Sequence, residues 1–207
     1  MISDRIVIRD GDADTAVIAE FEATRREAMR RGLAVGGVVI AAAMVPALLN
    51  VRNAFAQARD DEAVLVAAIG LENTAIAAYA AAIKSGLLDR PTTKIAELFK
   101  RQEAQHRDGL SAALKSLGGT PPSGANAALL KPLKRVKTQA EVASFAVELE
   151  TMAVAAYYDA QKKLKAAKLL QTGVQIMANE GQHLVVLRQA LKKDPVPNAF
   201  ENGKTAK

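Results

Sequence analysis

Apolar and charged residues interleave along four long stretches of the chain, and short breaks rich in Gly, Pro and Ser separate these stretches. The pattern predicts four helices, which cover residues 60–84, 91–116, 138–165 and 167–193. Thr138 and Glu141 have the spacing of a capping box at the start of the third helix. Ala, Leu, Lys and Glu are abundant and aromatic residues make up only 4% of the chain, so an all-α fold is expected.

The connections between the predicted helices differ in length. Few residues separate the first helix from the second, so these two must lie antiparallel. The link over residues 118–137 is much longer, and its Gly, Pro and Ser residues leave room for only a short turn near Ala125–Leu130. The tail over residues 194–207 is polar and proline-broken, and it is predicted to be flexible.

The N-terminal part has the pattern of an export signal. A basic segment ends at Arg31, an uncharged run follows from Gly32 to Val51, and an Ala-x-Ala sequence occurs at residues 54–56. Residues 24–30 (TRREAMR) resemble a twin-arginine signal, with Ala28 where that motif usually has a bulky apolar residue. The sequence therefore predicts transfer by the export machinery to the periplasm or another extracytoplasmic compartment.

Two fates of this signal stay open. Cleavage after Ala56 would divide the chain into an export signal (1–56), a helical domain (57–193) and the flexible tail (194–207). Alternatively, the 18 uncharged residues of Gly32–Leu49 could form a retained transmembrane anchor, although Pro46 interrupts them. Cleavage is the favoured prediction.

Charge and cysteine content exclude several classes of function. The net charge of +6 lies in residues 57–207, which carry 21 basic and 15 acidic side chains, because residues 1–56 carry 7 of each. A small basic cluster at residues 131–137 has no interleaved aromatic residues, so nucleic-acid binding is not expected. The chain has no cysteine, which excludes disulfides, thiolate ligands and a rubredoxin-type iron centre. Any metal must be held by nitrogen and oxygen atoms.

The candidate chemistry lies around the two histidines of the chain. His106 and His183 each have a glutamate three residues before them, Glu103 and Glu180. Residues three apart lie on one face of a helix, so each Glu-x-x-His pair can present two ligands to one metal ion.

A second pattern repeats together with the first. The segments Glu72–Tyr79 and Glu150–Tyr157 are identical at five of eight positions, and they precede Glu103 and Glu180 by 31 and 30 residues. The chain therefore looks like two copies of one helical hairpin. The repeat favours Glu150 over the neighbouring Glu148, because only Glu150 keeps the register of the tyrosines.

This residue set resembles the ferritin-like di-iron carboxylate proteins, in which two helices each contribute a Glu and two others each contribute a Glu-x-x-His. Bacterioferritin and rubrerythrin are the most similar members, and the resemblance covers about residues 60–193. It implies an antiparallel four-helix bundle whose long crossover link joins parallel second and third helices. It also implies that Glu103 and Glu180 bridge two metals. Glu72 and His106 would complete the coordination of one metal, and Glu150 and His183 that of the other.

The residues around the predicted ligands allow further expectations. Tyr79 and Tyr157 are either packed core residues or participants in redox chemistry. Gln102 and Asn179 have amide oxygens that could accept a hydrogen bond from an imidazole N–H. Four buried carboxylates need compensating charge, which two Fe or Mn ions would supply.

We therefore expect an exported di-metal protein, with possible ferroxidase or peroxidase activity, that oxidises metal or reduces O₂ or peroxide. The alternatives are iron storage or sequestration and a structural bundle with an inactive site. Because residues 194–207 are short and Pro195 and Pro197 oppose another helix, a monomer or homodimer is expected instead of a cage.

Overall fold

The computed structural model describes residues 44, 51, 53–55, 57–58 and 60–203. Within this part of the chain every regular element is helical, which confirms the all-α prediction. Four long helices and two short ones follow in the order α3 (Asp61–Lys84), α4 (Arg90–Ser116), α5 (Ala127–Leu130), η1 (Pro132–Arg135), α6 (Gln139–Ala160) and α7 (Ala167–Ala190).

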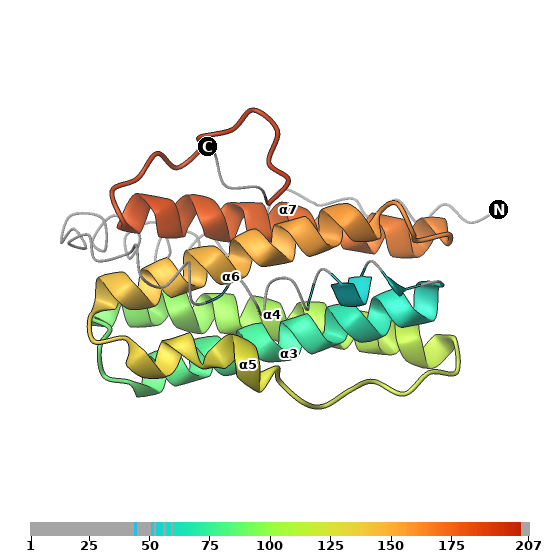
Figure 1. Cartoon of the computed structure of the whole chain (residues 1–207), viewed down its shortest axis with the longest axis horizontal. Coiled ribbons are helices and arrows are strands. Elements are labelled where there is room, and N and C mark those ends of the chain that lie inside the picture. The colour runs from blue at the N-terminus through green and yellow to red at the C-terminus, as the bar shows by residue number, and fades with distance from the viewer. Residues whose placement is uncertain (1–43, 45–50, 52, 56, 59, 204–207) are drawn as a thin grey trace, which may run out of the picture.

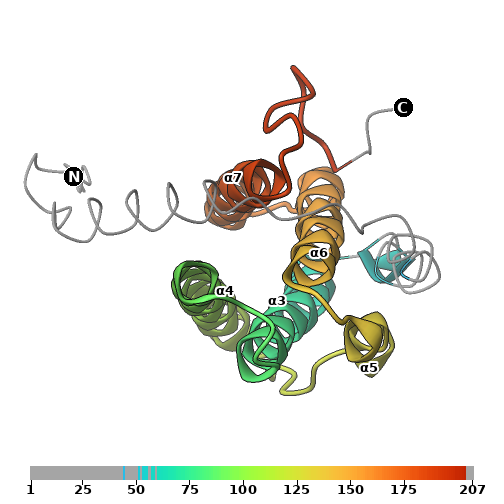
Figure 2. The same ribbon diagram turned by 90° about the vertical axis from the view of Figure 1, so that its left-hand side faces the viewer.

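The four long helices form a bundle made of two antiparallel hairpins. Helices α3 and α4 lie against each other as the first hairpin, and α6 and α7 as the second (Figure 1). Helices α4 and α6 run in the same direction, so the link between them travels the length of the bundle (Figure 1). The end-on view shows the four helices around a common centre, with α5 outside them beside α3 (Figure 2). The predicted bundle and its long crossover are therefore present.

Local interactions at the helix ends explain most of the boundaries. Asp60 is the N-cap of α3, and its carboxylate accepts a hydrogen bond from the backbone N–H of Ala63 at 2.9 Å. The predicted capping box of Thr138 and Glu141 is present at the start of α6. Gly86 follows the last turn of α3 with a φ of 70°, a left-handed conformation that glycine adopts without steric cost.

The third and fourth long helices end earlier than predicted. The sequence pattern extends the third helix to residue 165, but α6 ends at Ala160. The carboxylate of Asp61 accepts hydrogen bonds from the backbone N–H groups of Lys165 and Ala166, at 2.8 and 3.1 Å, and holds this connection in a non-helical form. Helix α7 ends at Ala190, and Lys192 then adopts a φ of 56°.

The crossover link is attached to the first helix. The side chain of Asn73 donates a hydrogen bond to the carbonyl of Pro122 at 2.8 Å, and the backbone N–H of Asn126 donates to the hydroxyl of Thr74 at 2.9 Å. Both contacts lie next to Glu72 in the sequence. The link thus fixes the part of α3 that carries one of the predicted ligands.

Two clusters of buried apolar side chains lie on either side of the predicted ligands. In α4, Phe99 belongs to one cluster and Leu110 to the other, and Glu103 lies between them. In α7, Ile176 and Leu184 flank Glu180 in the same way. The carboxylates therefore form a charged layer between two largely apolar clusters.

Segments outside the four helices also contact the bundle. Met44, Val51 and Phe55 are buried in the apolar cluster at the start of α3, a contribution that the sequence analysis missed. In the tail, Glu201 forms an ion pair with Arg188 of α7 at 2.9 Å. A Cβ added at Gly203 would lie only 2.4 Å from the carbonyl oxygen of Thr151, so the tail approaches α6 closely.

The predicted signal falls almost wholly outside the described residues, which include neither the twin-arginine motif nor most of the uncharged run. Among the described helices, α3 is long and apolar enough to cross a membrane by length and composition. However, 56% of its most apolar window is buried inside the bundle. The apolar composition of α3 is therefore that of a core helix of the bundle.

Candidate metal centre

The structure brings all six predicted ligands together at the centre of the bundle. Each long helix contributes one glutamate, and α4 and α7 also contribute a histidine, so that the set consists of Glu72, Glu103, His106, Glu150, Glu180 and His183. The side chains of the four glutamates are all at most 2% exposed. Such complete burial of four carboxylates is costly unless cations or hydrogen-bond donors compensate it.

The six ligands form two groups of four that share two members. One group contains Glu72 and His106, the other contains Glu150 and His183, and both contain Glu103 and Glu180. Within each group the ligand atoms lie within 4.8 Å of one another. The arrangement can hold two metal ions, with the two shared carboxylates between them.

His106 presents its Nδ1 atom to the first group. This nitrogen lies 3.1 Å from Oε1 of Glu180, 3.3 Å from Oε2 of Glu103 and 3.7 Å from Oε2 of Glu72. Its side chain is 12% exposed, because an open recess adjoins it on the outside of the bundle.

His183 presents its Nδ1 atom to the second group in a more enclosed setting. The atom lies 3.1 Å from Oε2 of Glu180 and 3.2 Å from Oε1 of Glu103. Its Nε2 atom lies 2.8 Å from Oε1 of Gln102. A proton on Nε2 would satisfy this acceptor and, in the neutral imidazole, leave Nδ1 able to bind a cation. Phe99 stacks on the imidazole with a centroid separation of 3.9 Å.

The unsatisfied polar atoms of the cluster fit bound cations. Oε1 of Glu103, both carboxylate oxygens of Glu180 and Nδ1 of His183 are buried. Each lies in a contact of 3.1–3.2 Å within the cluster, but none makes a hydrogen bond of normal geometry. Buried polar atoms without partners destabilise a fold, whereas two divalent ions would engage these atoms and balance four carboxylates. Hard oxygen ligands with two imidazoles suit Fe or Mn.

Burial and mutual repulsion disfavour ionisation of the glutamates in the cluster when no cation is bound. Burial raises the pKa of Glu72 and of Glu180 above the ordinary glutamate value, and neighbouring carboxylates raise both further. Burial alone would lower the pKa of His106, but its contacts with three carboxylates outweigh this effect and raise it to about 12. The protein environment therefore favours positive charge at this centre.

The two candidate tyrosines cross the bundle to the opposite hairpin. The hydroxyl of Tyr79 in α3 donates a hydrogen bond to Glu150 in α6, and the hydroxyl of Tyr157 in α6 donates to Glu72 in α3. Both tyrosines are fully buried, and burial raises the pKa of each above the ordinary tyrosine value. They therefore stay protonated and orient the two glutamates that are not shared.

Other sequence-based expectations around the centre have mixed outcomes. Glu148 lies outside both ligand groups, as the repeat predicts. Gln102 contacts His183, whereas Asn179 donates to Gln182 at 3.3 Å instead of contacting His106. The stacking of Phe99 on His183 was not predicted. Phe99 lies four residues before Glu103 on the same helix face, and this spacing could have indicated that Phe99 lies near the ligands.

The fold and the buried cluster define a class: helical bundles that can hold metal at their centre through Glu and His side chains. The ferritin-like domain family matches residues 60–193, and the chain belongs to this family.

Among solved structures, the chain is similar to that of a conserved hypothetical protein, rv2844, from Mycobacterium tuberculosis. The identity is 22% and the TM-score 0.56, and the match covers 68% of this chain and 96% of that chain. At this identity the similarity concerns the fold alone. No curated protein matches the sequence.

Proposed function

We propose that this chain is a di-metal protein of the bacterioferritin and rubrerythrin type, which holds two Fe or Mn ions and oxidises Fe(II) or reduces O₂ or peroxide. The observation that carries this proposal is the sharing of Glu103 and Glu180 by two ligand groups. Two adjacent metal positions suit a two-electron reaction better than a single position does.

The six predicted ligands would have different roles in such a centre. Glu103 and Glu180 would be shared by the two ions, and His106 and His183 would each hold one ion through Nδ1. The bound ions would supply one electron each. Two electrons together with two protons would suffice to reduce O₂ to H₂O₂, or H₂O₂ to two molecules of water.

The neighbouring residues position the ligands. Tyr79 and Tyr157 keep Glu150 and Glu72 in place through their hydroxyl groups, and Gln102 fixes the orientation of His183. Hydrogen bonds to ligating groups commonly affect metal affinity about 10- to 100-fold. Because burial keeps both tyrosines protonated, positioning is the role that their geometry supports best.

The purified full-length protein is expected to bind about two metal ions per chain after reconstitution with Fe(II) or Mn(II). Elemental analysis against protein concentration measures this ratio. A sample that stays at a small fraction of one ion per chain would support the alternative of a structural bundle with an inactive site.

Iron storage is the other alternative, and the geometry after α7 argues against it. Residues 191–203 do not continue the helix, and the ion pair of Glu201 with Arg188 holds them beside α7, where they cover its surface. We propose a monomer or a homodimer. Native mass measurement separates the two functions, because a cage-sized particle with a large iron core would establish storage.

We further propose that the protein is exported through a twin-arginine signal. Replacement of Arg25 and Arg26 by lysine is expected to leave the precursor in the cytoplasm, because this route depends on the arginine pair. Fractionation with immunodetection measures the distribution. Normal export of the double variant would assign the signal to another route.

The position of the mature N-terminus is a separate matter, and N-terminal sequencing of the exported protein determines it. Cleavage after Ala56 would remove Phe55, which is 1% exposed, from the apolar cluster beside α3. A retained N-terminus would therefore preserve this packing.

A further inference from the structure

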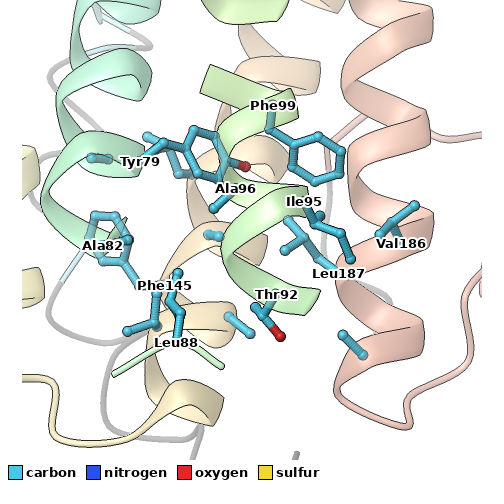
Figure 3. A pocket seen from close by; sticks show the side chains of 16 residues that line it. Tyr79, Ala82, Leu88, Thr92, Ile95, Ala96, Phe99, Phe145, Val186 and Leu187 are labelled. Atoms are coloured by element: carbon cyan, nitrogen blue, oxygen red, sulfur yellow. The ribbon is translucent and has the colours of Figure 1, made fainter. Parts of the chain in front are cut away.

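A cavity of about 40 Å³ lies among the four long helices at the end of the bundle where α3 ends and α4 begins. Figure 3 shows the side chains that line it, most of which are Ala, Leu, Ile, Val and Phe. Among the lining residues, only Tyr79 and Thr92 carry polar side-chain atoms. The cavity is therefore almost wholly apolar.

Two aromatic side chains that line the cavity also contact predicted metal ligands. Tyr79 bonds to Glu150, and Phe99 stacks on His183, so both lining residues contact the second ligand group directly. Tyr79 and Phe99 lie at one end of the cavity, and Leu88 and Thr92 lie at the other (Figure 3). Leu88 and Thr92 are only partly buried, so this end leads toward the outside of the bundle.

Size and polarity restrict what the cavity can hold. Its volume of about 40 Å³ leaves room for a molecule of the size of water or O₂, since a single water needs a cavity of about 10–15 Å³. A buried water needs two to four polar partners. The Tyr79 hydroxyl already donates to Glu150, and the Thr92 hydroxyl, which has no hydrogen-bond partner, offers only one. An apolar cavity of this kind stays dry and binds small apolar molecules. O₂ fits these requirements, whereas H₂O₂ and hydrated ions do not.

Polar molecules have a different approach to the centre. The recess beside His106 has a volume of about 210 Å³ and is lined by residues of α4 and α7 that include Gln105, Thr172 and Gln175. It lies on the other side of Glu103 from the cavity, because its α4 residues follow Glu103 and those of the cavity precede it. The centre thus has an almost wholly apolar cavity on one side and a recess with several polar side chains on the other.

We propose that the apolar cavity binds O₂ and delivers it to the Glu150 and His183 side of the centre, while metal ions and H₂O₂ enter by the recess at His106. The assignment of O₂ as the occupant rests on the proposed function. The capacity to bind a small apolar gas rests on the cavity alone and can be measured without metal.

Xenon binding to the metal-free full-length chain tests the cavity itself. Ala82→Val adds bulk to its wall and is expected to weaken xenon binding about tenfold, or about 1.4 kcal/mol. Ala68→Val is the matched control, because Ala68 is an equally buried alanine of the same helix that does not line the cavity. Ala143→Val, on the α6 wall, gives a second cavity variant. Absence of xenon binding in the unsubstituted protein, or equal binding in all variants, overturns the proposal.

Oxidation rates of the metal-loaded protein test delivery. In Ala82→Val or Ala143→Val, oxidation by O₂ is expected to slow about tenfold, the same factor as xenon binding, while oxidation by H₂O₂ stays at the rate of the Ala68→Val control. Equal slowing with both oxidants overturns the proposal. If the unsubstituted, loaded protein consumes neither oxidant, the proposed function fails, and the xenon titration still decides whether the cavity binds apolar gas.

Discussion

Glu103→Ala is expected to lower the rate of O₂ and H₂O₂ consumption by more than about 100-fold, since even residues that only support ligands commonly affect metal sites by 10- to 100-fold. Glu103 belongs to both ligand groups, so its loss removes a carboxylate from both metal positions at once. The metal content should fall below one ion per chain. Oxidant electrodes and elemental analysis on the same samples measure both effects.

The helical fold should survive this substitution, because alanine favours helix and one buried carboxylate is removed. Glu148→Ala is the matched control, because it removes a carboxylate of the same bundle that lies outside both ligand groups. Burial raises the pKa of Glu148, and the charge of Lys193 opposes this effect. It should retain metal and activity. Full activity of Glu103→Ala with a normal circular dichroism spectrum, or equal inactivity of Glu148→Ala, would contradict the assigned bridge.

Metal removal is expected to lower the thermal midpoint of unfolding by about 15 °C or more. Binding at a ligand concentration a thousandfold above Kd contributes about 4 kcal/mol per site, and each kcal/mol shifts the midpoint by about 2–4 °C in a chain of this size. The physical cause is the repulsion and desolvation of four buried carboxylates in the metal-free state.

Circular dichroism melts of chelator-treated protein, with and without Mn(II), measure this shift. Glu180→Ala should respond little to Mn(II), because Glu180 is the other residue that both ligand groups share. An identical midpoint with and without Mn(II) in the unsubstituted chain would show that the cluster does not bind this metal in the folded state.

The bundle and the positions of its central residues were predictable from the sequence, because both depend on regular helix geometry. The Glu-x-x-His spacing alone puts Glu103 and His106 on one face, and the internal repeat selects Glu150 over Glu148. The charged layer follows from these local patterns. The chemistry of the layer, the metal and the export route stay predictions.

Features that depend on contacts between distant segments were not predictable in the same way. The connection after α6 is held by Asp61, about 100 residues earlier, and no breaker residue near Lys165 indicates that the helix stops before it. The crosswise bonds of Tyr79 and Tyr157 depend on how α3 and α6 approach each other. The cavity arises from packing of small side chains, which a linear pattern does not specify.

The unequal surroundings of the two histidines have a consequence for how the protein would exchange its ions. His183 lies between Phe99 and Gln102 and is 1% exposed, whereas His106 is 12% exposed beside an open recess. An ion held at His106 would lie closer to solvent and exchange more readily, whereas an ion held at His183 would leave only when packed side chains move. Dilution or mild chelation would thus yield a half-loaded protein that retains the inner ion. In a mixture of iron and manganese, the order of arrival would decide which metal becomes trapped there.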